Sequence, residues 1–135
     1  MEAEIRVWFT LTGLDLDPNE ITTATNLEPS KAWRKGDLID PRRPARRHKE
    51  GGWSIASGCE DTVDIESQIK ALLKRLCPAR QALVSLGKRY DAEVECVMYI
   101  YGGERPAEHF DRDAVRQMAE LNASIDVDLY ILPAR

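Results

Sequence analysis

Three segments of this sequence alternate strictly between apolar and polar residues, and this alternation limits the chain to few folds. Successive side chains of a β-strand point to opposite faces of a sheet, so an alternating segment buries one face only. The apolar positions are Ile5, Val7, Phe9 and Leu11 in the first segment, Val94, Cys96, Met98 and Ile100 in the second (Glu93–Tyr101), and Ile125, Val127, Leu129 and Ile131 in the third (Ile125–Leu132). The pattern predicts a sheet with helices on one face.

Apolar residues between these strands recur every three or four positions, which predicts helices. Asp17 is suited to cap a short helix that begins at Pro18 and ends near Thr25. A longer helix is expected from about Asp64, and a second helical piece follows the break at Cys77-Pro78. Their apolar positions are Ile65, Ile69, Leu72, Leu73 and Leu76, then Leu83, Leu86 and Tyr90.

A last helix is predicted after Asp111, which is a suitable N-cap, with Phe110 placed to pack onto Val115. In this helix Val115, Met118, Ala119 and Asn122 are expected to share a side. Two short strands are expected around Ala32–Lys35 and Trp53–Ser57.

The resulting order is βαββαβαβ. It predicts an α+β fold with a ferredoxin-like βαββαβ core and an added αβ unit, in which an antiparallel-rich sheet has its helices packed on one face. A chain of 135 residues suits one domain, residues 1–135, that buries a core without disulfides or metal.

Basic residues gather in one stretch of an acidic protein. Residues 31–49 contain eight basic and two acidic residues, a net charge of +6, which leaves −10 for the rest of a chain whose total is −4. We expect a mobile basic loop at residues 36–51, because the connection is long for a hairpin. Such a charge contrast indicates a surface that meets an anionic partner.

Missing motifs and the scattered cysteines narrow the classes of function that this chain could have. It contains no P-loop, no dinucleotide-binding glycine motif and no HExxH zinc motif, so no cofactor and no metal site are predicted. Scattered Cys59, Cys77 and Cys96 fit reduced thiols. With no apolar run of membrane-spanning length and no leader peptide, we expect a cytoplasmic protein without membrane contact.

The polar side of the alternating strands is rich in aromatic residues, and we call this side the outer face. It collects Trp8, Val97, Tyr99, Tyr101, Tyr130 and Leu132, beside Arg6, Glu93, Glu95, Asp126 and Asp128. So many aromatics on an open face favour a protein partner or self-association. A covering by the chain's own loop or terminus, or a small ligand, are the alternatives.

The basic loop offers a second candidate site. Phosphate contacts from Arg42, Arg43, Arg46 and Arg47, with base stacking on Trp33 or Trp53, would give a nucleic-acid-binding protein. The acidic remainder of the chain makes another protein surface the favoured target.

Catalytic alternatives rest on scattered residues. Cys59, His109 and Asp111 could form a nucleophilic arrangement in space. The acidic residues Glu104, Glu108, Asp111 and Asp113 could supply acid and base, although helix caps and solvated loop charges explain them more simply. The favoured hypothesis is therefore a non-enzymatic protein-interaction domain.

An ordered set of motifs resembles a known family. LDLDPNEIT, SKAWRKGD, GGW, LLKRL and LNASIDVDLY occur in this order from about Ile5 to Tyr130. Together they resemble the domain of unknown function 4279 family of bacterial proteins. The resemblance implies a small single-domain protein and carries no enzymatic role to this chain.

Overall fold

A mixed five-stranded sheet organises the chain in the computed structural model, which describes residues 2–59, 64–103 and 108–135. The elements are β1 (Glu2–Gly13), α1 (Pro18–Thr25), β2 (Lys31–Trp33), β3 (Gly51–Ala56), α2 (Ile65–Leu76), a 3₁₀ turn (Cys77–Ala79), α3 (Arg80–Arg89), β4 (Asp91–Tyr101), α4 (Arg112–Glu120) and β5 (Ala123–Leu132). The strand order is β2-β3-β1-β4-β5. Only the β4–β5 pair of these strands is parallel. The α+β prediction is confirmed.

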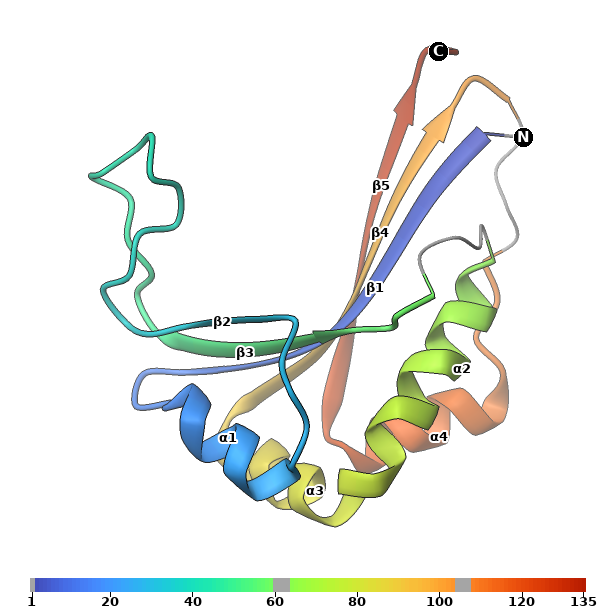
Figure 1. The fold of residues 1–135 in the computed structure, drawn as a ribbon. Helices are drawn as coiled ribbons and strands as arrows, with labels where there is room; N and C mark the ends of the chain where they lie inside the picture. The colour runs from blue at the N-terminus through green and yellow to red at the C-terminus, as the bar shows by residue number, and fades with distance from the viewer. Residues whose placement is uncertain (1, 60–63, 104–107) are drawn as a thin grey trace.

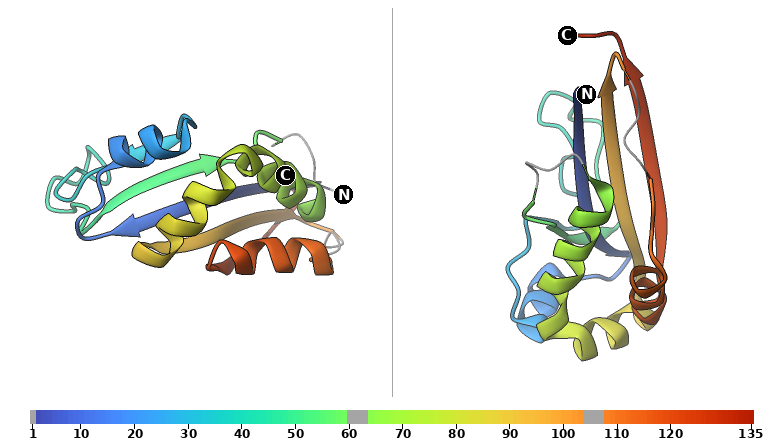
Figure 2. Two further views of the ribbon diagram at one scale, coloured as in Figure 1. Left: turned by 90° about the horizontal axis from the view of Figure 1, so that it is seen from below. Right: turned by 90° about the vertical axis from the view of Figure 1, so that its right-hand side faces the viewer.

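The helices α1 to α4 lie on one face of this sheet, as the views from the side and from below show (Figures 1 and 2). The core fills the space between them and the strands. Its buried side chains include all the predicted apolar positions of β1 and β4, together with Ile65, Ile69, Leu72 and Leu76 of α2. The period-two and helical patterns of these segments are therefore confirmed.

Aspartate caps begin three of the helices. The side chain of Asp17 accepts a hydrogen bond from the Asn19 N–H at 3.0 Å, and Asp111 does the same for the Ala114 N–H at 2.8 Å. Asp64 caps α2 in the same way. These bonds satisfy N–H groups that have no partner within the helix. Helix α1 ends where Asn26 adopts a left-handed φ of 56°.

The buried side of α4 differs from the prediction. Ala114, Met118 and Leu121 are 3%, 1% and 4% exposed, whereas Val115 is 47% exposed. Ala119 and Asn122 are exposed too. Positions 114, 118 and 121 follow the four-then-three spacing of one helix face. Met118 is therefore buried as predicted, but the prediction was wrong for Val115, Ala119 and Asn122, because it took Val115 instead of Ala114 as the apolar anchor.

Strand β5 forms one edge of the sheet, and its helix-side apolar residues are only partly covered. Ile125 and Val127 align with Val94 and Cys96 of β4, yet they are 40% and 38% exposed. Ile131 is 65% exposed. An edge strand lacks a neighbour on one side, so the third alternating segment buries less than the alternation implied.

The basic loop between β2 and β3 extends away from the body as an irregular hairpin (Figure 1). The His48 N–H donates to the Asp37 carbonyl at 2.8 Å, the Ile39 N–H donates to the Arg46 carbonyl at 3.2 Å, and Leu38 and Arg47 form a bridge. The loop's hydrogen bonds thus lie largely within the loop. Its mobility stays a prediction.

Candidate functional site

The strand register aligns the outer-face residues of β1, β4 and β5 in rows across the sheet. Trp8 of β1 lies opposite Glu95 of β4, which aligns with Asp126 of β5. One row further along, Arg6 lies beside Val97 and Asp128. All helices of the described residues lie on the other face (Figure 2), so the predicted outer face exists as one continuous surface.

A groove is hollowed into this face and encloses about 320 Å³. We call it the aromatic groove. It is lined by Trp8, Thr10, Lys31, Trp33, Ser54, Glu95 and Val97. These residues come from the four strands β1 to β4, so the groove exists only once the sheet has assembled.

Small residues of β3 make room for the tryptophan that closes one end of the groove. Gly52 pairs with Trp33, and a Cβ atom at Gly52 would lie 2.1 Å from Trp33 Cζ2. The Trp33 ring stacks on His48 with centroids 4.8 Å apart, and Lys31 Nζ lies 5.4 Å from the Trp33 ring. The ring thus lies next to Gly52 and contacts His48, at the junction of the groove and the basic loop.

The floor of the groove is polar and internally bonded. The hydroxyl groups of Thr10 and Ser54 are hydrogen-bonded at 2.9 Å, and both residues are 5% exposed. Each hydroxyl retains further donor or acceptor capacity. The groove therefore offers two large rings, a satisfied hydroxyl pair and the charges of Lys31 and Glu95.

Carboxylates crowd the outer face beside the groove. Desolvation raises the pKa of Glu93 above its usual range, and the nearby carboxylates of Glu95 and three aspartates, Asp126, Asp91 and Asp128, raise it further. Within the described part of the chain, none of these carboxylates is in an ion pair. Burial alone raises a carboxyl pKa, but the part that comes from the neighbouring carboxylates reflects a negative local potential, so this part of the face attracts cations.

Tyrosines continue the surface toward the far end of β4 and β5. The rings of Tyr99 and Tyr130 are stacked with centroids 5.1 Å apart. The Arg135 guanidinium lies 3.6 Å from the centre of the Tyr101 ring and pairs with Glu4 at 2.5 Å. The C-terminal residue thus covers Tyr101, while the aromatic groove remains open.

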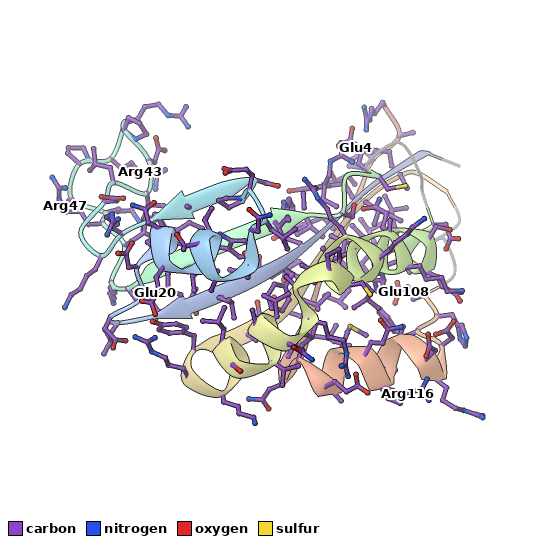
Figure 3. The ribbon with its side chains drawn as sticks, turned by 60° about the horizontal axis from the view of Figure 1, so that its bottom comes forward. Glu4, Glu20, Arg43, Arg47, Glu108 and Arg116 are labelled. Carbon is purple, nitrogen blue, oxygen red and sulfur yellow. The ribbon has the colours of Figure 1, made fainter. Side chains whose placement is uncertain are left out.

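The structure brings some predicted site residues together and separates others. Trp8 and Trp33 share the groove with Val97, and Tyr99 and Tyr130 lie along the same face. Arg42, Arg43, Arg46 and Arg47 belong to the loop between β2 and β3, and Figure 3 shows Arg43 and Arg47 on this loop at one end of the molecule.

Trp53 must be removed from the candidate site residues. It pairs with Leu11, so its side chain points to the helix-covered face, where it is completely buried. Its Nε1–H donates to Thr22 Oγ1 of α1 at 3.1 Å. A side chain in this position stabilises the core and cannot stack on a ligand.

The sequence reasoning missed three residues of the groove. Lys31, Thr10 and Ser54 carry no local pattern that marks a site, because they meet only through the pairing of β2, β3 and β1. The alternation of Thr10 with its apolar neighbours placed it on the outer face, which is the one indication that was available.

The catalytic alternatives gain no support. Among the described residues, no hydrogen bond joins Cys59, His109 and Asp111. The Asp111 carboxylate instead caps α4 and pairs with Lys70 at 3.2 Å, which together lower its pKa. Burial raises the pKa of the Cys96 thiol to about 12, so this thiol is inert. Glu104 of the acidic set lies outside the described residues.

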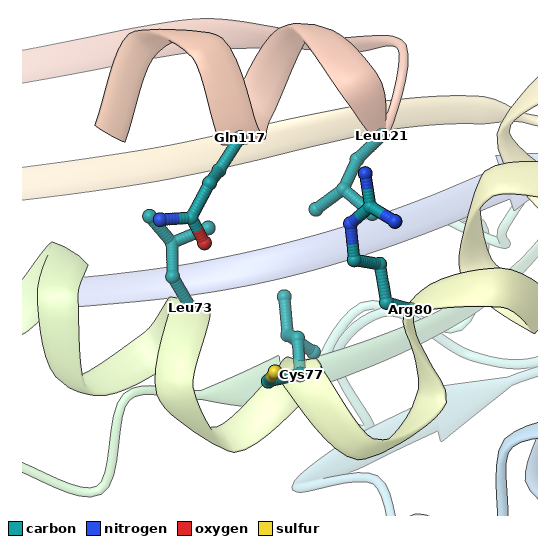
Figure 4. A pocket seen from close by; sticks show the side chains of 6 residues that line it. Leu73, Cys77, Arg80, Gln117 and Leu121 are labelled. Carbon is teal, nitrogen blue, oxygen red and sulfur yellow. The ribbon is translucent and has the colours of Figure 1, made fainter. Parts of the chain in front are cut away.

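A second hollow lies between α2 and α4 on the helix side (Figure 4). It is lined by Leu73, Leu76, Cys77, Arg80, Gln117 and Leu121. Its volume of about 20 Å³ is enough for one water molecule. Arg80 is paired with Glu120 of α4, so we regard this hollow as a feature of helix packing.

The fold and the outer face together define an α+β protein with one mixed sheet, helices on one side and an aromatic, carboxylate-rich surface on the other. Residues 3–132 match the family described as Domain of unknown function (DUF4279), and the chain belongs to this family. The motif-based assignment is thus confirmed. No curated protein and no solved structure matches the chain. Within the described residues, no helix is long and apolar enough to cross a membrane.

Proposed function

We propose that this chain is a non-enzymatic protein-interaction domain that binds its partner on the outer face of the sheet, assisted by the basic loop. The observation that carries the proposal is the aromatic groove, which holds Trp8 and Trp33 on a face that the helices leave free. Tryptophan and tyrosine are enriched at the centres of protein interfaces because they bury much area and keep a polar group for hydrogen bonding.

The surroundings of the groove support the same proposal. Interface centres bury large side chains and interface rims are polar. The groove is flanked by the carboxylates of β4 and β5 and by the positive charges of the loop. Opposite charges at two edges of one surface would orient a partner during its approach.

The test compares proteins captured by paired variants of the tagged chain. Trp8→Ala with Tyr99→Ala removes two rings from the outer face, and we expect it to abolish capture of a near-stoichiometric partner seen with the unchanged protein. Leu14→Ala with Val115→Ala is the control, since these apolar side chains are 71% and 47% exposed and lie outside the outer face. Unchanged circular dichroism establishes that both variants fold. Equal capture by the Trp8/Tyr99 variant would refute the proposal.

Nucleic-acid binding is a second candidate, supported by the loop alone. The side chains of Arg43 and Arg46 have no hydrogen-bond or ion-pair partner among the described residues, so they are available to phosphates. Binding of a labelled oligonucleotide, followed by fluorescence anisotropy, should then weaken steeply with salt. A flat salt profile, or no binding at low salt, would reject this candidate.

We also propose that β1 to β4 with α1 and α2 form a ferredoxin-like core, to which α4 and β5 are added. The order β2-β3-β1-β4 with antiparallel neighbours supports this proposal. A cytoplasmic location is proposed as well, and three free cysteines support it, since disulfides are rare in that compartment.

A further inference from the structure

We infer that the partner of the outer face is a second copy of this chain, with the basic loop of each copy docked on the carboxylates and the aromatic groove of the other. This inference rests on the proposed function, because it names the partner of the same face. It follows from the charges of the two surfaces and from their places at opposite edges of the sheet.

The loop carries positive charge that its own chain does not neutralise. Arg42 pairs with Asp40 at 3.2 Å and Arg47 donates to the Gly36 carbonyl at 2.9 Å. Arg43 and Arg46 have no side-chain partner in the described part of the chain. Figure 3 shows Arg43 on the protruding loop, away from the body, so its guanidinium group can reach another molecule.

The outer face carries the complementary negative charge. Glu93 and Glu95 of β4 lie beside Asp126 and Asp128 of β5, and the pKa of Glu93 is raised first by desolvation and then by repulsion from these neighbouring carboxylates. The described cations of this face include Arg6 and Lys31, and Arg135 lies over Tyr101 near the far end. Arginine side chains arriving from another molecule would relieve the repulsion, pair with carboxylates in a bidentate manner and stack on aromatic rings.

The two charged regions lie at opposite edges of one sheet, which prevents them from meeting within one chain. The loop leaves from β2 and β3, whereas the carboxylates stand on β4 and β5, and β1 separates the two pairs. Internal hydrogen bonds and the stacking of Trp33 on His48 hold the base of the loop in place. The loop therefore does not fold back over its own outer face.

A two-fold axis between two copies would bring the basic loop of each copy to the carboxylates of the other. When two copies face each other across an axis that runs parallel to the strands, the β2–β3 edge of each copy lies opposite the β4–β5 edge of the other. Both loop-to-carboxylate contacts then form at once, and the assembly closes as a dimer.

Charge reversal tests this dimer by sedimentation velocity. The loop variant is Arg43→Glu with Arg46→Glu, and the face variant is Asp126→Lys with Asp128→Lys; these four side chains are exposed, so folding should persist. The control, Lys74→Glu with Arg112→Glu, makes the same charge change as the loop variant on exposed helix positions.

We expect the unchanged chain and the control to form dimers that weaken as salt rises from about 50 to about 500 mM. Each reversed variant alone should lose at least about tenfold in dimer affinity. An equimolar mixture of the two should restore dimers, because every contact again joins opposite charges.

Three outcomes would overturn the inference. The unchanged chain could stay monomeric at every concentration, the charge-reversed variants could dimerise as well as the unchanged chain, or the mixture of the two variants could fail to restore dimers. Association of the unchanged chain only when nucleic acid is present would also overturn it, in favour of the alternative occupant. The proposed function is tested separately from self-association. If the chain is monomeric but still captures a different protein through Trp8 and Tyr99, the protein-interaction proposal stands and self-association is rejected.

Discussion

The adjacent glycines of β3, Gly51 and Gly52, are both buried, but a larger side chain would disturb a different neighbour at each position. A Cβ atom at Gly52 would meet the end of the Trp33 ring, which lies at the surface and can swing away. A Cβ atom at Gly51 would lie 2.2 Å from the Leu16 carbonyl oxygen, which belongs to the backbone and cannot move without the loop that carries it. Gly51 is therefore required for the packing of the backbone around Leu16, and Gly52 leaves room for the Trp33 ring of the groove.

We predict that Gly51→Ala lowers the free energy of unfolding by about 3 kcal/mol, the upper end of the usual cost of overpacking. Gly52→Ala should cost less than about 1 kcal/mol, since the main loss is the stacking of Trp33 on His48. Urea denaturation measures both values. Gly52→Ala should also weaken partner capture, and equal costs for the two variants would contradict the distinct tasks.

At the scale of elements, a side chain of α2 takes over hydrogen bonding to β1 where β3 ends. Strand β3 stops at Ala56, so the neighbouring β1 has no strand partner on that side at Ile5. Gln68 of α2 is completely buried there, and its Nε2 donates to the Ile5 carbonyl at 2.6 Å. Its Oε1 accepts a hydrogen bond from Ser57 Oγ at 3.2 Å. One polar side chain thus joins α2 to two segments of the sheet.

We predict that Gln68→Leu lowers the free energy of unfolding by about 1–3 kcal/mol, because it leaves the buried Ile5 carbonyl and Ser57 hydroxyl without this partner. The same substitution at Gln81, which is exposed on α3, serves as the control and should change stability by less than about 0.5 kcal/mol. Chemical denaturation of both variants makes the comparison. A neutral Gln68→Leu variant would show that the bond network contributes nothing.

At the scale of the whole molecule, the basic loop and the body are separable. The core consists of residues from β1, β3, β4 and the helices, and it contains no residue of the loop beyond Gly36 and before Gly51. The bridge between Leu38 and Arg47 marks a point where the two arms of the loop are already side by side. The loop can therefore be shortened at this point without disturbing the core.

We predict that replacing residues 39–46 by Asn-Gly, which favours a tight two-residue hairpin turn, leaves the melting temperature nearly unchanged. The same variant should lose self-association, since Arg43 and Arg46 are removed with the segment. Thermal denaturation by circular dichroism and sedimentation velocity measure the two effects. A large fall in melting temperature would mean that the loop supports the body.

The local patterns of the sequence determined much of the architecture. The alternation in β1 and β4 identified the buried side of each strand, because side-chain direction along a strand depends only on position. Asp17 and Asp111 placed the starts of two helices, because a cap acts within three residues of itself, and the spacing of apolar residues placed the start of α2 near Asp64. These features rely on short-range geometry, which a single sequence contains.

Only the tertiary structure decided which surfaces meet. The pairing of β2 with β3 brought Trp33 to the same groove as Trp8, and the register of β3 turned Trp53 into the core. The edge position of β5 left Ile125 and Val127 partly exposed, although their alternation resembles that of buried strands. The physical reason is that periodicity fixes the side on which a residue lies, whereas its neighbours depend on contacts between segments far apart in the chain.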